Sequence, residues 1–301
     1  MAPVLRQIVN LWTLIEHPSK ETEWSLNEKL DAICAAGFDG VCWAPSRELH
    51  EGALQRGLIF VGGMASGDVM AFPSILHELR RYGAHHVNVQ LAADNVLAPE
   101  AFNLAVQLIR EADRLGLKAA IETHRGTCTE TPEKLFALAD AYANETGQLL
   151  PASWDFSHFA VVKHLVAENF AERLLIRSDL IQNAQQFHFR PFNGHHVQVP
   201  ITDSGGRLTR EVLEWLPFAE SVLTCWLTAN LTTDREIFIC PELGPLAGGY
   251  ALSTFPSSWE DTLRLREEID RLWSKVIASV STSEPSRRAD GTALENAPSS
   301  A

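Results

Sequence analysis

Four side chains that can bind a metal ion recur through the second half of this 301-residue chain, each near the end of a short apolar run. Glu122 follows KAAI, Asp155 ends LPASWD, His188 lies within QFHFR, and Glu242 follows IFICP. Glu122 and Asp155 are 33 positions apart, Asp155 and His188 are again 33 apart, and Glu242 comes 54 positions later. Because about 30 residues make one strand–helix–strand unit, we expect the four side chains at the ends of consecutive parallel strands.

Three carboxylates and one imidazole make a site of mostly hard oxygen ligands. Such a site suits one divalent ion, for which we expect Mn²⁺, with Mg²⁺, Co²⁺ or Zn²⁺ as alternatives. A substrate could chelate the ion through adjacent hydroxyl and carbonyl oxygens. The ion would polarise the carbonyl and stabilise the enediolate that forms when a neighbouring C–H loses its proton. One carboxylate can take that proton, and a second on the other side could return it.

Strand-like and helix-like segments alternate along the chain, which is typical of an α/β protein. Eight apolar runs are candidate strands: 8–14, 38–43, 57–64, 84–91, 117–124, 150–155, 185–190 and 237–243. Six segments of helical period lie between or after them: 25–38, 73–84, 99–117, 131–147, 208–226 and 258–276. Residues 44–56 hold at most a small helix, and Pro217 interrupts one of the longer ones. Eight strands close a TIM barrel, so we predict a single-domain (β/α)8 fold.

We expect this barrel to span residues 1–280 and residues 281–301, which are small and polar, to form a disordered tail. The surplus length between His188 and Glu242 falls in residues 191–206, just after the seventh strand. In such barrels the active site lies at the carboxyl ends of the strands, where long loops set substrate choice.

The composition limits the partners. A formal net charge of -13 argues against a surface that follows nucleic acid or anionic lipid. The five cysteines lack a CxxC spacing, which favours scattered reduced thiols. No signal peptide and no stretch of about 20 apolar residues is evident, so we expect a cytoplasmic protein. Assembly into a homo-oligomer stays open.

The pattern AIETHRG…WDFSH…FHFRP…CPELGP resembles the xylose-isomerase-like TIM-barrel superfamily. That superfamily holds sugar isomerases, ketose 3-epimerases, inosose and dehydroshikimate dehydratases and AP endonucleases. The resemblance implies that the Glu, Asp, His and Glu at the ends of strands five to eight bind one metal ion and that the two Glu residues handle protons. These are Glu122, Asp155, His188 and Glu242. It also implies that His158, three positions after the Asp, and Arg190, downstream of the metal His, contact substrate.

Each residue also has a structural interpretation. Asp155 could also cap a helix, and His188 could be a core histidine with satisfied hydrogen bonds. His124, two positions after Glu122, is a candidate substrate contact. Other side chains could contact a substrate, but packing in the core explains them about as well. These are His86, Asn88 and Gln90, at period two on the fourth strand, and Trp12 and Trp43, which could form an apolar wall against a sugar face.

Two functions fit these residues best. The first is a metal-dependent isomerase or epimerase of a sugar, cyclitol or other polyhydroxylated small molecule. The second is a lyase that forms the same carbanion and then expels a hydroxyl or glycosyl group. An AP endonuclease would need further His and Glu ligands and a basic face, which the sequence lacks, and a barrel that only binds a ligand would not need the full set. No Gly-rich phosphate cradle stands out, which disfavours a phosphorylated substrate.

Overall fold

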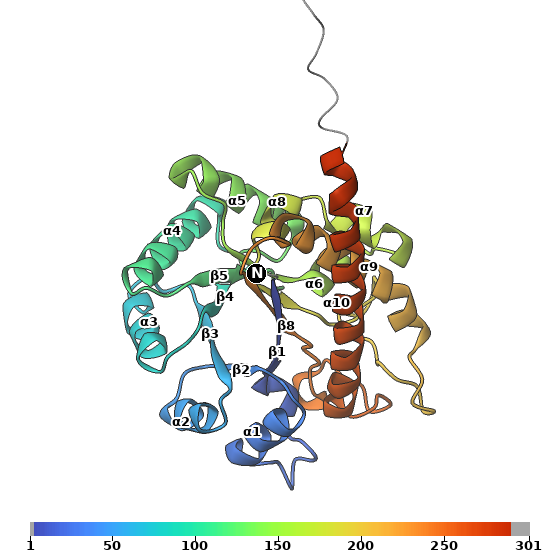
Figure 1. The fold of residues 1–301 in the computed structure, drawn as a ribbon. Coiled ribbons are helices and arrows are strands. Elements are labelled where there is room, and N and C mark those ends of the chain that lie inside the picture. The colour runs from blue at the N-terminus through green and yellow to red at the C-terminus, as the bar shows by residue number, and fades with distance from the viewer. Residues whose placement is uncertain (1–2, 290–301) are drawn as a thin grey trace, which may run out of the picture.

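Eight parallel strands close into a barrel in the computed structural model, which describes residues 3–289. The strands pair in chain order, with β8 returning to β1 (Figure 1). Their bounds are β1 Val4–Asn10, β2 Gly40–Trp43, β3 Ile59–Ser66, β4 Val87–Leu91, β5 Ala119–Glu122, β6 Ala152–Asp155, β7 Gln186–His188 and β8 Glu236–Cys240. The predicted single-domain (β/α)8 barrel is confirmed.

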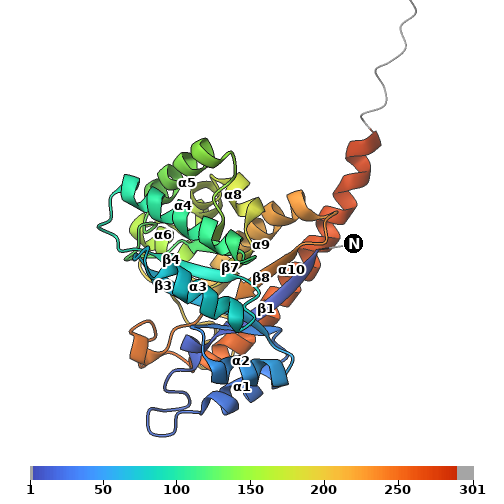
Figure 2. The ribbon, with the colours of Figure 1, turned by 90° about the vertical axis from the view of Figure 1, so that its left-hand side faces the viewer.

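Helices surround the strands, and the long C-terminal helix α10 runs along the barrel and beyond it (Figure 2). The α-helices are α1 Leu26–Ala35, α2 Arg47–Gln55, α3 Phe72–Arg81, α4 Ala98–Arg114, α5 Pro132–Thr146, α6 Phe156–Val162, α7 Phe170–Leu174, α8 Ser178–Asn183, α9 Arg210–Asn230 and α10 Ser258–Ala289. Within residues 3–289 there are also three 3-10 helices: η1 Leu11–Leu14, η2 Ala167–Asn169 and η3 Leu246–Gly248. Among the helices of residues 3–289, none combines the length and the apolar character needed to cross a bilayer.

Local sequence signals account for most helix ends. Ser25 caps α1 in a reciprocal capping box with Glu28. Helix α5 has Thr131 as its N-cap, Pro132 in its first turn, and Gly147 in the left-handed conformation after its last turn. These signals determine where each helix begins and ends, and so where the neighbouring strands can start.

The structure differs from the sequence-based prediction in four places. The first strand ends at Asn10, because the Asn10 side chain caps η1 and turns the following residues into a 3-10 helix. Between β6 and β7 the chain forms short helices that the prediction left out. Helix α9 continues through Pro217. The predicted tail begins inside α10, which continues to Ala289, and residues 290–301 lie outside the described residues.

The barrel interior has an apolar part and a polar part. A small cluster of Ile8, Cys42, Val61, Phe238 and Cys240 comes from β1, β2, β3 and β8. From the opposite strands come buried polar side chains, among them His86, Asn88, Ser153 and Gln186. All five cysteines are free. The larger core lies between the outer faces of the strands and the helices.

The close pairing of β2 with β3 makes Gly40 a sensitive position. A Cβ atom on Gly40 would lie 2.3 Å from the backbone oxygen of Ile59, its partner in the register. We expect Gly40→Ala to lower the free energy of unfolding by about 1–3 kcal/mol, the usual cost of overpacking, as measured by urea denaturation. An unchanged free energy would show that the two strands separate easily at this point.

Candidate metal centre

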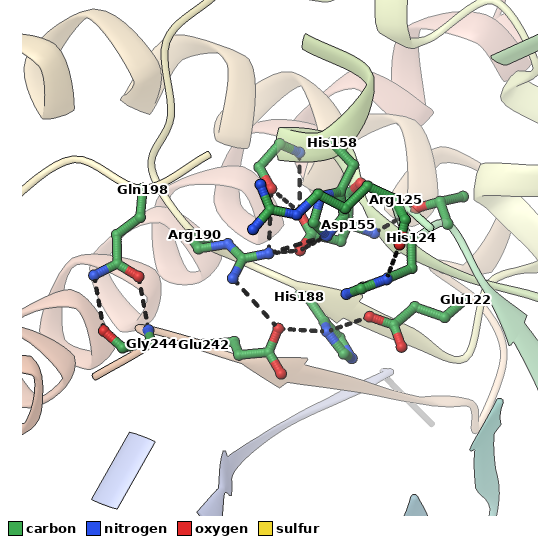
Figure 3. A network of polar contacts seen from close by, with 12 residues as sticks. Glu122, His124, Arg125, Asp155, His158, His188, Arg190, Gln198, Glu242 and Gly244 are labelled. Carbon is green, nitrogen blue, oxygen red and sulfur yellow. Dashed lines mark hydrogen bonds and ion pairs between the residues drawn. The ribbon is translucent and has the colours of Figure 1, made fainter. Parts of the chain in front are cut away.

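The four predicted side chains meet at one end of the barrel. Glu122 ends β5, Asp155 ends β6, His188 ends β7, and Glu242 follows β8 by two residues. All four are buried, and one ligand atom of each lies within 4.8 Å of all the others. The strand register explains the meeting, because Asp155 pairs with His188 and His188 with Cys240. Figure 3 shows His188 between the two glutamates.

Each carboxylate uses one oxygen for a neutral donor and turns the other toward this common centre. Asn10 Nδ2 donates to Glu242 Oε1 at 2.5 Å, and Asn88 Nδ2 donates to Glu122 Oε2 at 2.8 Å. The backbone N–H and the hydroxyl of Ser157 both donate to Asp155 Oδ1. Asp155 is therefore the N-cap of α6, as one interpretation of the sequence predicted, and keeps Oδ2 for the centre.

Cations hold the three carboxylates in their charged form. Burial raises the pKa of Glu122 and of Glu242, but the charge and hydrogen bonding of His188 outweigh it, and both pKa values lie below the ordinary value. Burial likewise raises the pKa of Asp155, and Arg190 and then His158 lower it well below its usual range. Burial lowers the pKa of His188, but Glu242 and Glu122 raise it well above the ordinary value.

The donor set fits a divalent ion. His188 Nδ1 lies 3.0 Å from Glu242 Oε2 and 3.2 Å from Glu122 Oε1, so a proton holds these three atoms together. Glu122 Oε1 is buried, and apart from this contact with His188 it has no hydrogen-bond partner in the described part of the chain. Three carboxylate oxygens and one imidazole nitrogen lie close together here, and they have too few hydrogen-bond donors around them. Such a set matches the ligands that Mn²⁺ or Mg²⁺ prefers. Glu122, Asp155, His188 and Glu242 are the residues that would hold the ion.

The predicted substrate-contact residues lie beside this cluster. Arg190 is 1% exposed; its Nη2 forms an ion pair with Asp155, and its Nη1 lies 3.9 Å from Glu242 Oε2. His158 Nε2 lies 3.4 Å from Asp155 Oδ2 and 3.3 Å from Arg190 Nη2. His124 packs edge-on against His158, with ring centroids 4.4 Å apart. The structure thus brings all three residues to the centre.

A buried polar chain supports His188 from within the barrel. The Gln186 amide nitrogen lies 2.6 Å from His188 Nε2, and its oxygen lies 2.7 Å from His86 Nε2. His86 Nδ1 in turn lies 3.0 Å from His85 Nδ1. Burial lowers the pKa of His86 to about 3, so His86 is neutral. An amide nitrogen donates a hydrogen bond and an amide oxygen accepts one. The Gln186 atom that faces His188 therefore determines whether Nε2 of His188 carries a proton.

The loops after β1, β7 and β8 contact one another and cover the cluster. Gln198, from the long segment after β7, exchanges two hydrogen bonds with the backbone of Gly244. A Cβ atom on Gly244 would lie 2.2 Å from the Trp12 ring, so only glycine allows Trp12 and Tyr250 to pack here. A cavity of about 280 Å³ lies beneath, lined by Asn10, Trp12, Trp43, Gln90, His124, Arg190, Glu242 and Tyr250.

Sequence reasoning missed several of these residues. Gln186 has a usable signal, because it lies two positions before His188 on a strand and therefore shares its face. Asn10 was obscured because the predicted first strand ran past it. Ser157, Gln198 and Tyr250 lie in irregular or short segments, where no periodicity marks a side chain that points inward.

The comparisons with known proteins support the fold. No protein-family model matches the chain, and no curated protein matches its sequence. Solved structures do match. A D-tagatose 3-epimerase-like protein has a TM-score of 0.57 at 15% identity, covering 90% of this chain and 99% of that chain. A xylose isomerase domain containing protein from Salmonella typhimurium has a TM-score of 0.55 at 13% identity, covering 89% and 97%.

A third similar structure is described as a probable 3-DHS dehydratase involved in petrobactin synthesis, from Bacillus anthracis. It has a TM-score of 0.51 at 10% identity and covers 87% of this chain and 98% of that chain. The resemblance to xylose-isomerase-like barrels is thus confirmed for the fold, and the similar structures include one described as an L-ribulose 3-epimerase and one described as a probable dehydratase.

An ion that binds the folded state should stabilise it. We expect Mn²⁺ at about 100 times its Kd to raise the unfolding temperature by about 5 °C relative to protein with EDTA. Asp155→Asn should largely abolish this shift, because an Asn side chain still caps α6 but removes one carboxylate. An equal shift in Asp155→Asn would contradict the assignment of Asp155 as a ligand.

Removing the amide next to His188 should weaken ion binding. Gln186→Met keeps a similar volume but leaves His188 Nε2 without a hydrogen-bond partner. We expect the Kd for Mn²⁺ to rise about 10–100-fold, as measured by calorimetry, because partners behind a ligand fix its orientation and tautomer. The matched variant Gln148→Met, at an exposed position, should leave the Kd unchanged. If both variants bind equally well, Gln186 has no part in orienting the ligand.

Proposed function

We propose that this protein is a divalent-metal-dependent isomerase or epimerase of a sugar or another polyhydroxylated small molecule. The observation that carries the proposal is the pair Glu122 and Glu242, which approach one centre from β5 and from the residues after β8, with His188 between them (Figure 3). Both are buried carboxylates whose pKa values lie below the ordinary value, so both are ionised at neutral pH.

The ion supplies one kind of chemistry when bound: it polarises a substrate carbonyl and so acidifies the neighbouring C–H. The side chains of the protein orient the groups that transfer the proton. Asn10 and Asn88 each hold one oxygen of Glu242 and Glu122, respectively, which fixes the orientation of both carboxylates on either side of the space that a substrate would occupy. The two glutamates are thereby oriented for proton transfer from opposite sides of that substrate.

The proton balance follows from this arrangement. One glutamate accepts the proton as the C–H bond breaks, and the other delivers a proton as a new C–H bond forms on the opposite face. Because both are ionised at rest, the delivering carboxyl must first take a proton from a substrate hydroxyl or from water. After the step, the accepting glutamate releases its proton to that same hydroxyl or to water, so both carboxylates are ionised again. His158 is kept neutral, since burial lowers its pKa to about 3, and its neutral ring can hydrogen-bond a hydroxyl group in either role.

The cavity suits a sugar-like molecule. Trp12, Trp43 and Tyr250 offer aromatic surface to the apolar face of a sugar, and Asn10 and Gln90 offer amides to its hydroxyl groups. The neighbours described as D-tagatose 3-epimerase-like and as D-psicose 3-epimerase with D-tagatose point in the same direction. Manganese is the ion that we would test first.

A lyase is the second candidate. The same proton abstraction leads to elimination when a hydroxyl or glycosyl group sits on the next carbon, so the four proposed ligands serve either reaction. The likeness to a probable dehydratase supports keeping it. Product mass separates the two, since an isomer has the mass of the substrate and a dehydration product has lost water.

The test of this function begins with metal content. Protein loaded with Mn²⁺ and then dialysed should retain about one ion per chain by elemental analysis, and Glu242→Gln should retain clearly less. In D₂O the loaded protein should exchange the C–H next to the carbonyl of ketoses or keto-cyclitols. Glu242→Gln should exchange at least about 100-fold more slowly, a typical loss for a general acid–base residue.

The control is Glu145→Gln, which removes a carboxylate from an exposed position on α5 and should leave metal content and exchange unchanged. Retention of no ion by the unmodified protein would rule out the proposed chemistry, and retention of three ions would favour a nuclease instead.

A further inference from the structure

Two guanidinium groups converge on one aromatic ring at the mouth of the candidate site. The Cζ atom of Arg125 lies 4.5 Å from the ring centroid of Tyr250, and the Cζ atom of Arg190 lies 5.0 Å from it. The three residues come from the loops after β5, β7 and β8. Trp12 packs edge-on against the same ring, with centroids 4.6 Å apart, which fixes its position.

His158 lies close to both cations. Burial lowers its pKa first, and the charges of Arg190 and Arg125 both lower it further against the opposing effect of Asp155. Figure 3 shows the Arg125 and Arg190 side chains on the same side of the cluster as His158. The mouth of the site therefore combines two permanent positive charges with a neutral histidine.

The two arginines differ in their counterions. Arg190 forms an ion pair with Asp155 and lies near Glu242. Arg125 is exposed, and no carboxylate in the described part of the chain forms an ion pair with it; its guanidinium lies over the ring of Tyr250. In a chain of net charge -13, an arginine without a carboxylate partner beside a buried cluster is a feature that needs an explanation.

The net charge of the cluster changes when a divalent ion binds. An imidazole that binds a metal ion does so in its neutral form, so His188 adds no charge once the ion is bound. Three carboxylates then carry three negative charges, and a divalent ion with Arg190 carries three positive charges, so the cluster is neutral. Arg125 then leaves one positive charge at the mouth. A substrate with a single negative charge would complete the balance, whereas a neutral sugar would leave Arg125 without a partner.

We propose that the substrate carries a carboxylate, and that Arg125, positioned by Tyr250, binds it. The proposed ligand is thus a keto acid derived from a sugar or cyclitol. Its carbonyl end would lie at the buried cluster and its hydroxyl groups beside Asn10 and Gln90. Its carboxylate would lie beyond Tyr250, which lines the cavity, toward Arg125 on the Tyr250 ring. A guanidinium pairs with a carboxylate through two parallel hydrogen bonds, which gives both strength and direction. This inference rests on the proposed function for its account of the carbonyl end.

The experiment compares matched probes on the Mn²⁺-loaded full-length protein. D-Fructose and D-fructuronate differ at one end, where a hydroxymethyl group is replaced by a carboxylate, and D-tagatose and D-tagaturonate form a second pair. Binding is followed by tryptophan fluorescence, since Trp12 and Trp43 line the cavity. We expect at least one keto acid to bind at least about 10-fold more tightly than its neutral partner.

Variants assign the preference to its residue. Arg125→Met should abolish the preference for the keto acid while changing the affinity for the neutral ketose less than about twofold, and Arg125→Lys should restore part of it. The matched control Arg210→Met removes an arginine at an exposed position on α9 and should leave both affinities unchanged. Equal binding within both probe pairs, or binding of neither member, would overturn the inference, as would a preference that survives in Arg125→Met.

The outcomes separate this inference from the proposed function. Deuterium exchange on neutral ketoses without any preference for keto acids would leave the proposed function standing and overturn the inference. A preference for keto acids that depends on Arg125, in protein that retains no ion and catalyses no exchange, would support the inference and overturn the proposed function.

Discussion

Crowding of three ionised carboxylates in a buried space is the constraint on which the rest of this site depends. Their oxygens lie within 4.8 Å of one another and of His188, where little water screens the repulsion. Buried charges of one sign persist only when cations and hydrogen-bond donors compensate them. In this chain the compensation comes from the protonated His188 and from Arg190, both delivered by β7 and the residues directly after it.

The same constraint requires the barrel to be closed. The donor that holds Glu242 is Asn10, which is 232 positions away in the chain and reaches it only because β1 pairs with β8. Asn88 reaches Glu122 because β4 pairs with β5. A slip of one residue in either register would turn the donor to the other face of its strand and leave a buried carboxylate oxygen without a partner.

Much of this could be predicted from the sequence, and the reasons for the rest are physical. The four proposed ligands were predictable because each ends an apolar run, and parallel strands bring such ends together. The Asn10–Glu242 contact was not, because it needs the closing register of the barrel. The contact of Gln186 with His86 joins residues 100 positions apart, and no local pattern records it. Tyr250 lies in an irregular loop, where neither helical nor strand period applies.

The division between strands and loops also divides the chemistry. Strand ends place the carboxylates and His188, and these suit any reaction that begins with proton removal next to a carbonyl. The loops supply Arg125 and Tyr250, which under the proposed preference for a carboxylate have no part in that step and discriminate between substrates. Arg190 joins the two parts, since it contacts both Asp155 and Tyr250. Under the proposed function, an ion that neutralises the carboxylates strengthens the positive field of Arg190 and Arg125 at the mouth. Ion binding and anion binding then favour each other, and by thermodynamic linkage each raises the affinity for the other by the same factor.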